Sequence, residues 1–341
     1  MALKPTFKSV VGTFVRNPLL RPVVRRSALR KINIFYYHHV GPSAPHYKAF
    51  YSGCTVSKLA EDLRALSYVF DFVTLPELVT AEPPKQRPQR PTIAITFDDG
   101  FDLCRDEVMQ VLADYRVRAT TFIITSCMDN ARMMWRHALS AIQALVPESV
   151  WRRAFDRLSV AYGFTPIGNQ ELLAATAQWN MRHKDEWSVL LWQSCGLPPI
   201  EEYLDERQPY FTWSGLRQWL SAGHSVGFHT HTHPYCSRLA LGDLDAEFVR
   251  PALALQRRLN LSRLWLSYPF GERLQPSVER HLVELGLFDA YLGIEGCSPR
   301  GTPKEALGRA AAEADDVGWT LLRGILGAGR AGKRKVAACH V

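Results

Sequence analysis

The chain has 341 residues, of which 47% are hydrophobic and 22% charged, an ordinary composition for a globular protein with a sizeable core. Lys and Arg outnumber Asp and Glu by 41 to 33, but the basic residues gather at the termini and form no aromatic-studded basic motif, so we expect no binding to nucleic acid. The seven cysteines contain no Cys-x-x-Cys pair, which argues against a zinc knuckle and a disulfide framework and favours thiols in a reducing compartment.

Residues 1–30 are predicted to form a basic leader. Its apolar residues are interrupted repeatedly by Lys and Arg, so it lacks the apolar core of a secretory signal, and no segment of the chain is suited to spanning a bilayer. We therefore expect a cytoplasmic protein. The mixture of apolar and basic residues is compatible with peripheral contact between the leader and an anionic membrane surface, at the inner face of the membrane.

Strands and helices alternate in the first part of the chain. Runs of β-branched and aromatic residues predict strands, and apolar residues at helical spacing predict helices. This alternation favours a parallel α/β sheet or barrel, since parallel strands need crossover connections. The expected elements are a strand at 31–40, a helix at 56–66, a strand at 72–75, a Pro-rich loop at 82–91, a strand at 92–97, a helix at 105–115 and a strand at 119–124.

The middle of the chain differs in character. Residues 128–210 have helical periodicity and are predicted to be a helical insertion in a single barrel domain that spans 31–323. The Gly-, Ala-, Lys- and Arg-rich residues 324–341 are expected to form a flexible basic tail. After the insertion we expect a helix at 213–222, a strand at 225–228, a helix at 243–259, a strand at 264–268, a helix at 275–286 and a strand at 290–292.

The first cluster with chemical potential is Thr96-Phe97-Asp98-Asp99-Gly100, at the end of a predicted strand. Two adjacent carboxylates point in different directions once the chain leaves a strand, so one can bind a metal while the other faces a substrate. Gly100 allows the backbone to turn at once. Taken alone, this segment would more often be a solvated acidic turn.

The second cluster contains three alternating histidines, His229, His231 and His233, which also follow a predicted strand. Two imidazoles and one carboxylate suit a catalytic zinc-type ion that keeps positions open for water and substrate. His229 and His233 share a side if a helical turn follows, and in an extended chain His231 points away from its neighbours. Local geometry therefore leaves open whether His231 or His233 joins His229 at the metal.

Together, the TFDDG motif and the later His-Thr-x-x-His-Pro motif resemble the polysaccharide deacetylase family, the NodB-homology carbohydrate esterases, over about Ile34 to Arg309. The resemblance implies a distorted (β/α) barrel. It also implies that Asp98 is the catalytic base and that Asp99, His229 and His233 hold one divalent metal ion, zinc or another first-row metal. Tyr37-His38-His39-Val40 is similar to a strand that opens the barrel near the site in the exopolysaccharide-biosynthesis branch of the family.

Two departures from the family pattern concern proton transfer. The third family motif is Arg-x-Pro-Tyr-Gly, whereas this chain has Ser267-Tyr268-Pro269-Phe270-Gly271, a YPFG form without the arginine that orients the base. Arg309, in Leu307-Gly308-Arg309, resembles the Leu-Pro-Arg end of that branch and is the candidate substitute. The late Leu-x-His motif that supplies a general acid is missing, and His281 is expected on a helix surface.

The resemblance implies a hydrolase that removes acetyl or similar acyl groups from the N-acetylated sugars of a polysaccharide, an oligosaccharide or a lipid-linked glycan. The proton for the departing amine then comes from Asp98, His38 or His231. Tyr268 and Phe270 are candidates for lining the pocket. The full set of candidates for substrate or supporting contacts is His38, Thr230, His231, Tyr268, Phe270 and Arg309.

Two other interpretations are weaker. A degenerate metal- and sugar-binding module of the same fold is favoured by the missing arginine and late histidine but opposed by the intact Asp98, Asp99, His229 and His233. An amidohydrolase-type hydrolase is suggested by His229-x-His231, but that fold needs such a pair near its first strand, and here the pair comes late.

Overall fold

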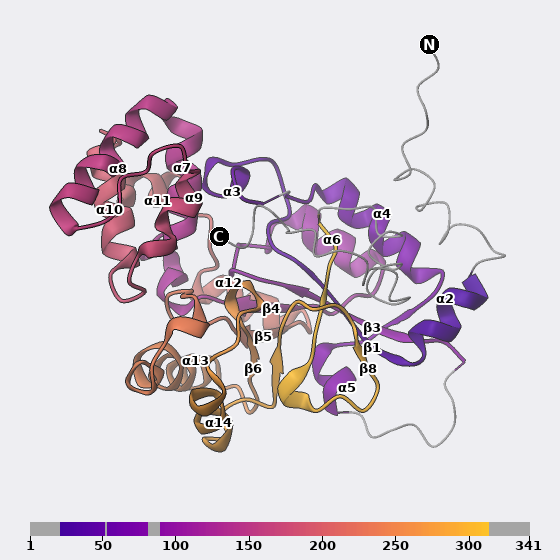
Figure 1. Ribbon diagram of the computed structural model, residues 1–341. Coiled ribbons are helices and arrows are strands. Elements are labelled where there is room, and N and C mark those ends of the chain that lie inside the picture. The colour runs from indigo at the N-terminus through magenta and orange to yellow at the C-terminus, as the bar shows by residue number, and fades with distance from the viewer. Residues whose placement is uncertain (1–20, 52, 81–88, 314–341) are drawn as a thin grey trace, which may run out of the picture.

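The computed structural model describes residues 21–51, 53–80 and 89–313 (Figure 1). The first twenty residues of the predicted leader, most of the Pro-rich loop and the whole predicted tail, 324–341, lie outside these ranges. The described part of the leader forms helix α2 (Arg21–Ala28), whose Val24 and Ala28 are buried. Arg25 donates a 2.7 Å hydrogen bond from Nη2 to the carbonyl oxygen of Tyr68. This helix therefore packs on the domain that follows it.

A sheet of parallel strands forms the centre of the molecule. Its order is β7-β6-β5-β4-β3-β1-β8, with β2 added to β3 and β9 added to β1, and the pairing of β1 with β8 is antiparallel. The strands are β1 (Lys31–Tyr37), β2 (Asp71–Phe72), β3 (Thr92–Phe97), β4 (Thr120–Ile123), β5 (Ser225–Phe228), β6 (Trp265–Ser267), β7 (Ala290–Leu292), β8 (Ser298–Pro299) and β9 (Ala310–Ala311).

The last described segment joins the two ends of this sheet. Leu307 forms a parallel bridge with Leu292 of β7, and a few residues later β9 pairs with β1. The segment 307–311 therefore runs between β7 and β1, and the sheet curls into the distorted (β/α) barrel that the family resemblance predicted. Since parallel strands all end at one edge, the barrel brings the residues that follow them to one face.

Alternate side chains of each strand point into the barrel or out toward the helices. A small apolar cluster fills the interior, while the outward residues, such as Phe35 and Phe228, belong to a larger cluster. Gly227 faces inward, and a Cβ atom there would lie 2.4 Å from the ring of Phe122, so only glycine leaves room for that ring. The interior cluster includes Ile34, Ala94, Phe122, Trp265, Ala290 and Leu292.

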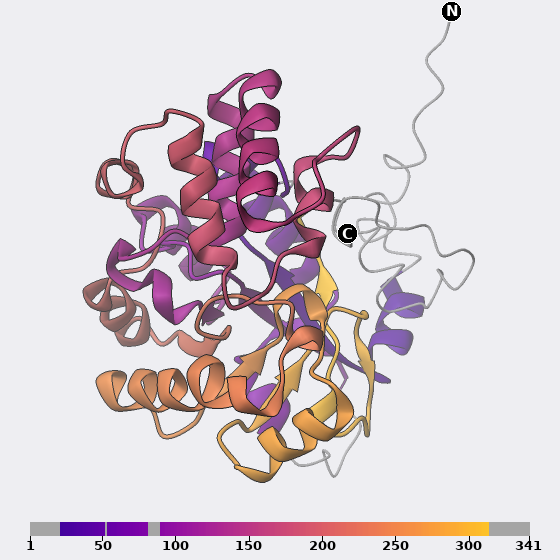
Figure 2. The same ribbon diagram turned by 60° about the vertical axis from the view of Figure 1, so that its left-hand side comes forward.

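Helices surround the sheet, and a second group of helices stands together on one side of it (Figures 1 and 2). The first set is α3 (Pro45–Lys48), α4 (Val56–Ser67), α5 (Leu75–Thr80), α6 (Asp106–Asp114), α12 (Trp213–Ser221), α13 (Arg250–Leu259) and α14 (Pro276–Glu284). The second set, here called the helical segment, is α7 (Trp135–Leu145), α8 (Glu148–Tyr162), α9 (Leu172–Ala175), α10 (Lys184–Ser194) and α11 (Ile200–Arg207). Throughout the described ranges, no helix has both the length and the apolar character that a membrane span requires.

The helical segment coincides with the predicted insertion at 128–210, while the division of the chain into leader, barrel, insertion and tail stays a prediction. Several expected elements differ in the structure. The strand expected at 31–40 ends at Tyr37, and the first part of the helix expected at 243–259 is a π-helix (Asp245–Val249). The strand expected at 72–75 ends at Phe72, because Thr74 and Glu77 form a reciprocal cap for α5. The backbone N–H of Thr74 donates to Glu77 Oε2 (2.7 Å), and that of Glu77 donates to Thr74 Oγ1 (3.2 Å).

Candidate metal centre and active site

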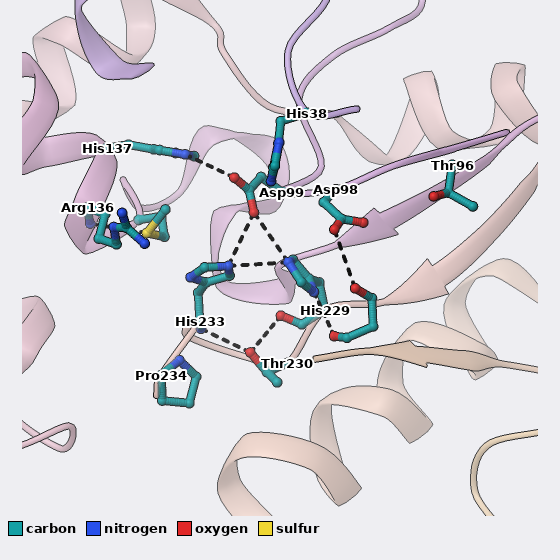
Figure 3. A network of polar contacts seen from close by, with 12 residues as sticks. His38, Thr96, Asp98, Asp99, Arg136, His137, His229, Thr230, His233 and Pro234 are labelled. Atoms are coloured by element: carbon teal, nitrogen blue, oxygen red, sulfur yellow. Dashed lines mark hydrogen bonds and ion pairs between the residues drawn. The ribbon is translucent and has the colours of Figure 1, made fainter. Parts of the chain in front are cut away.

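The residues of both sequence clusters meet at the carboxyl edge of the barrel strands (Figure 3). Asp98 and Asp99 directly follow β3, and His229 directly follows β5. Asp99 and Gly100 both have φ of 67°, in the left-handed region. The chain therefore turns at Asp99, so that Asp98 keeps the inward direction of the strand while the Asp99 carboxylate is directed elsewhere.

Asp99, His229 and His233 form a compact triad, here called the metal triad. Asp99 Oδ1 lies 3.4 Å from His229 Nε2 and 3.3 Å from His233 Nε2, and the two imidazole nitrogens are 3.2 Å apart. One potential ligand atom from each residue lies within 4.8 Å of the others. The geometry thus pairs His229 with His233, and His231 is not part of the triad.

A tight loop, rather than a helical turn, brings the two histidines together. Thr230 and His233 have φ of 65° and 56°, an uncommon conformation for residues other than glycine. The Thr230 hydroxyl accepts a hydrogen bond from the backbone N–H of His233 (3.0 Å) and donates one to the carbonyl oxygen of His229 (2.6 Å). His229 Nδ1 donates to the carbonyl oxygen of Ser267 (2.7 Å), which leaves the lone pair of Nε2 directed at Asp99.

The triad has the properties of a divalent metal site. Asp99 is 1% exposed, and neither carboxylate oxygen has a hydrogen-bond donor among the described residues. Burial would raise the pKa of Asp99, but His233, together with His137 and His229, holds it well below its ordinary value. Burial lowers the pKa of His233 to about 3, so its imidazole is neutral. An ionised carboxylate beside two imidazoles, with no hydrogen-bond partner among the described residues, is a donor set that zinc-type ions use, so these residues fit a metal.

Asp98 has a different environment, because Arg309 binds it in a bidentate ion pair. Arg309 Nη1 and Nη2 lie 2.8 Å from Asp98 Oδ1 and Oδ2, and Nη2 also donates to Ser267 Oγ (2.7 Å). Burial would raise the pKa of Asp98, but the guanidinium outweighs this effect and keeps the pKa below its ordinary value. The closing segment of the barrel thus supplies the arginine that the YPFG motif lacks.

His38, at the end of β1, faces the same edge of the barrel and is paired with Glu313. His38 Nδ1 lies 2.9 Å from Glu313 Oε2, and the backbone N–H of His38 donates to Oε1 of the same carboxylate. Burial would lower the pKa of His38, but Glu313, aided by Asp99 and Asp98, raises it to about 9. His38 is therefore a protonated imidazolium at neutral pH. Glu313 was not among the residues that the sequence analysis selected.

The helical segment contributes two further residues that the sequence analysis did not select, His137 and Arg136 of α7. His137 Nε2 lies 3.3 Å from Asp99 Oδ2, and His137 Nδ1 lies 2.7 Å from the hydroxyl of Tyr210. The same hydroxyl oxygen accepts a hydrogen bond from the backbone N–H of Met134 (3.1 Å), so His137 is held between Tyr210 and Asp99. In the sequence these residues sit in an ordinary helical pattern without a motif.

His231 lies away from the metal triad. Its Nδ1 is 2.9 Å from the hydroxyl of Thr125, and it lines a separate pocket of about 400 Å³ together with Trp213 and Arg250. No residue of the triad lines that pocket. His231 therefore lines a pocket to which the triad residues do not contribute. His281, on α14, is exposed at the surface, as the sequence analysis expected.

The two aromatic candidates for the pocket, Tyr268 and Phe270, separate in the structure. Tyr268 is fully buried on the outer side of the barrel, where its hydroxyl donates to Glu279 Oε1 (2.7 Å), so it does not line the site. Phe270 has φ of 58°, and its ring lies edge-on to His233 with 4.5 Å between the centroids. Phe270 therefore forms part of the wall of the site.

Comparisons with known proteins agree with this geometry. The profile of the polysaccharide deacetylase family matches residues 85–160 and 168–287, together more than half of the chain. Among solved structures, the Streptococcus pyogenes deacetylase PplD in complex with acetate is 15% identical, with a TM-score of 0.56, over 86% of this chain and 98% of that one. IcaB from Ammonifex degensii is 16% identical, with a TM-score of 0.53, over 86% and 97%. At these identities the likeness shows the fold. A search of curated protein sequences found no match.

Proposed function

Because this chain belongs to the polysaccharide deacetylase family, we propose that it is a metal-dependent hydrolase that removes acetyl, or similar acyl, groups from N-acetylated sugars. Its substrate would be a polysaccharide, an oligosaccharide or a lipid-linked glycan. The observation that supports this most strongly is the contrast between two adjacent carboxylates. Asp98 is ionised and held by Arg309, whereas Asp99 faces imidazoles and has no hydrogen-bond donor.

Asp99, His229 and His233 would hold one divalent ion, zinc or another first-row metal. When bound, such an ion acts as a Lewis acid that polarises a carbonyl oxygen and acidifies water. His137 Nε2 lies 3.3 Å from Asp99 Oδ2, whereas Oδ1 lies close to both His229 and His233. His229 is fixed in the required tautomer by the carbonyl of Ser267.

Asp98 would act as the general base. It is ionised over the physiological pH range, and the bidentate Arg309 fixes its orientation. Oδ2 also accepts from the Ser267 hydroxyl (3.5 Å), so Oδ1 is the oxygen that keeps a second lone pair among the described residues. Asp98 would take a proton from the water that attacks the acetamide carbonyl.

His38 would act as the general acid. Breaking the C–N bond of the tetrahedral intermediate releases an amine, which needs one proton as acetate leaves. His38 is protonated at neutral pH because of Glu313, and among the candidates His231 belongs to a different pocket. His38 then recovers its proton from solvent through its partly exposed side chain. The late family histidine that is missing here is thereby replaced by a residue from the first strand.

The cellular location stays a proposal as well. The six cysteines within the described ranges are free thiols, which supports the expectation of a reducing, cytoplasmic compartment. Contact of the basic leader with an anionic membrane surface is not addressed by the described residues. Fractionation of cells that express the full chain would test both ideas, and an exported form with a cleaved N-terminus would overturn the cytoplasmic assignment.

Release of acetate is the direct test of the function. Purified protein is incubated with N-acetylated oligosaccharides and lipid-linked glycans, with chelator, without chelator, and after chelation and return of zinc, cobalt or nickel. We expect acetate release that chelator removes and added metal restores. If the protein binds both metal and glycan but releases no acetate from any substrate, it is instead a binding module of the same fold.

A further inference from the structure

Arg136 is a buried charge that has no counter-ion among the residues that the structure describes. Its side chain is 2% exposed, its Nε has no hydrogen-bond partner, and within the described ranges its guanidinium forms no ion pair. Arg309 is equally buried but is bound by Asp98 and Ser267. A guanidinium stays charged at every physiological pH, and burying it unpaired is costly. Arg136 is therefore suited to binding an anion that the described residues do not provide.

Aromatic rings surround this guanidinium at the wall of the active site. The Arg136 guanidinium carbon lies 4.5 Å from the ring centroid of Phe270, 5.6 Å from that of Phe50 and 5.9 Å from that of Tyr51. These three aromatic residues are partly exposed, so the rings that cover the guanidinium lie at the surface of the protein. Contacts with ring faces offset only part of the desolvation of a cation and do not neutralise its charge.

Arg136 also lies close to the metal triad. Figure 3 shows it near His137 and His233, and the ring of Phe270 contacts both His233 and the Arg136 guanidinium. Trp135, the first residue of α7, donates from Nε1 to the carbonyl oxygen of His233 (2.9 Å). This bond connects the start of the helix to the loop that carries His233. The N-terminus of a helix of this length carries partial positive charge and favours an anion at the same place.

The charges of the site support the same conclusion. Asp98 is neutralised by Arg309, and Glu313 by His38. The metal triad contains one carboxylate, so a divalent ion bound there would leave one positive charge, and Arg136 adds another. A neutral N-acetylated sugar would leave both uncompensated, whereas a substrate with an acidic group would balance them.

We propose that Arg136 and the first turn of α7 bind a phosphate or carboxylate group on the acetylated substrate, so that the substrate is an acidic sugar rather than a neutral one. This inference rests on the proposed deacetylase function, because it takes the acetamide to lie at the metal triad. Arg136 contacts the far side of the Phe270 wall rather than the triad itself. The anionic group therefore belongs to another part of the substrate than the acetyl group that becomes acetate.

Binding of small probes tests the proposal independently of catalysis. Calorimetry on the chelator-treated full chain compares N-acetylglucosamine with its 1-phosphate, and with N-acetylmuramic acid, which carries a carboxylate. Charge-assisted hydrogen bonds predict that at least one acidic probe binds about tenfold or more tightly than the neutral sugar. The two acidic probes distinguish a phosphate from a carboxylate as the preferred group. Arg136→Gln should remove the preference, and Arg136→Lys should keep part of it.

Arg132→Gln is the matched control, since it removes the same charge from an exposed position a few residues earlier and should keep the preference. Equal affinity of the wild-type protein for all three probes would overturn the proposal, and this comparison does not depend on whether a variant folds. So would an Arg136→Gln protein that folds normally and still prefers acidic probes. Acetate release is measured in parallel. A preference for acidic probes without hydrolysis would support the anion site and contradict the deacetylase function. Hydrolysis without such a preference would support the deacetylase function and contradict the anion site.

Discussion

Asp98 and Asp99 are neighbours in the chain and both are buried, but their charges are compensated differently. We call the surroundings of Asp98 the base side of the active site and those of Asp99 the metal side. On the base side, Asp98 is paired with Arg309 and His38 is paired with Glu313. On the metal side, and among the described residues, the oxygens of Asp99 and the Nε atom of Arg136 have no hydrogen-bond partner. Buried charges are normally paired, so the contrast needs a functional explanation.

The comparison separates two uses of charge in one barrel. Paired groups are held in a fixed orientation and protonation state, which suits proton transfer by Asp98 and His38. Unpaired groups are available to ligands from outside the chain, a cation for Asp99 and an anion for Arg136. Each of the following predictions substitutes residues on one side of the site, and the unchanged side serves as the reference.

The largest effect is expected on the metal side. His233→Ala removes one of three ligands, so bound metal should fall from about one ion per chain to near zero, and most of the activity should be lost with it. Metal content is measured by elemental analysis and activity by acetate release. His231→Ala is the control, because this residue faces another pocket. Equal loss of metal from both variants would show that the triad is wrongly assigned.

On the base side, Arg309→Met leaves the Asp98 carboxylate buried without its partner. We expect a loss of about 3–5 kcal/mol in the free energy of unfolding at neutral pH, measured by denaturant titration. Since Arg309 lowers the pKa of Asp98, its removal should also move the acid limb of the pH–rate profile to higher pH. Arg263→Met, at an exposed position, should change neither quantity. Addition of Asp98→Asn to Arg309→Met should recover stability, because no unpaired charge remains.

Asp98→Asn by itself keeps the shape of the base and removes its ability to take a proton. Turnover should fall about a hundredfold or more, which corresponds to about 2.7 kcal/mol, while bound metal stays near one ion per chain. The separation of rate from metal content sharpens the comparison, because the two adjacent carboxylates then have different functions. Turnover equal to that of the wild-type protein would contradict the assignment of Asp98 as the base.

The smallest effect is expected for Glu313→Gln. Only the protonated form of His38 can donate a proton, so wild-type activity should decline as the pH rises through about 9. Glu313 raises this pKa, so its removal should move the alkaline limb to lower pH, by roughly one to two units. Asp98, Asp99 and Tyr51 also face His38 and are unchanged in this variant. An alkaline limb that does not move would exclude His38 as the general acid.

Most of the barrel was predictable from local patterns. The strands at 92–97 and 225–228, for example, are short runs of apolar residues followed by turn residues, and both have the expected bounds. The strand expected at 31–40 ends three residues earlier, at Tyr37. The strand expected at 72–75 was wrong in its second half, since the Thr74–Glu77 cap starts a helix there. The two-residue strands β8 and β9 were not expected, because two residues carry no periodicity.

The sequence by itself determined the two motifs of the site, since an Asp-Asp-Gly turn and a His-x-x-x-His spacing are local features that can be recognised from the order of residues alone. Which histidine joins His229 was decided by the tertiary structure, through the left-handed turns at Thr230 and His233. Arg309, Glu313 and the α7 residues reach the site from distant parts of the chain, when the barrel closes and the helical segment packs against it. Their roles depend on burial and on the presence or absence of a partner, and those properties exist only after folding.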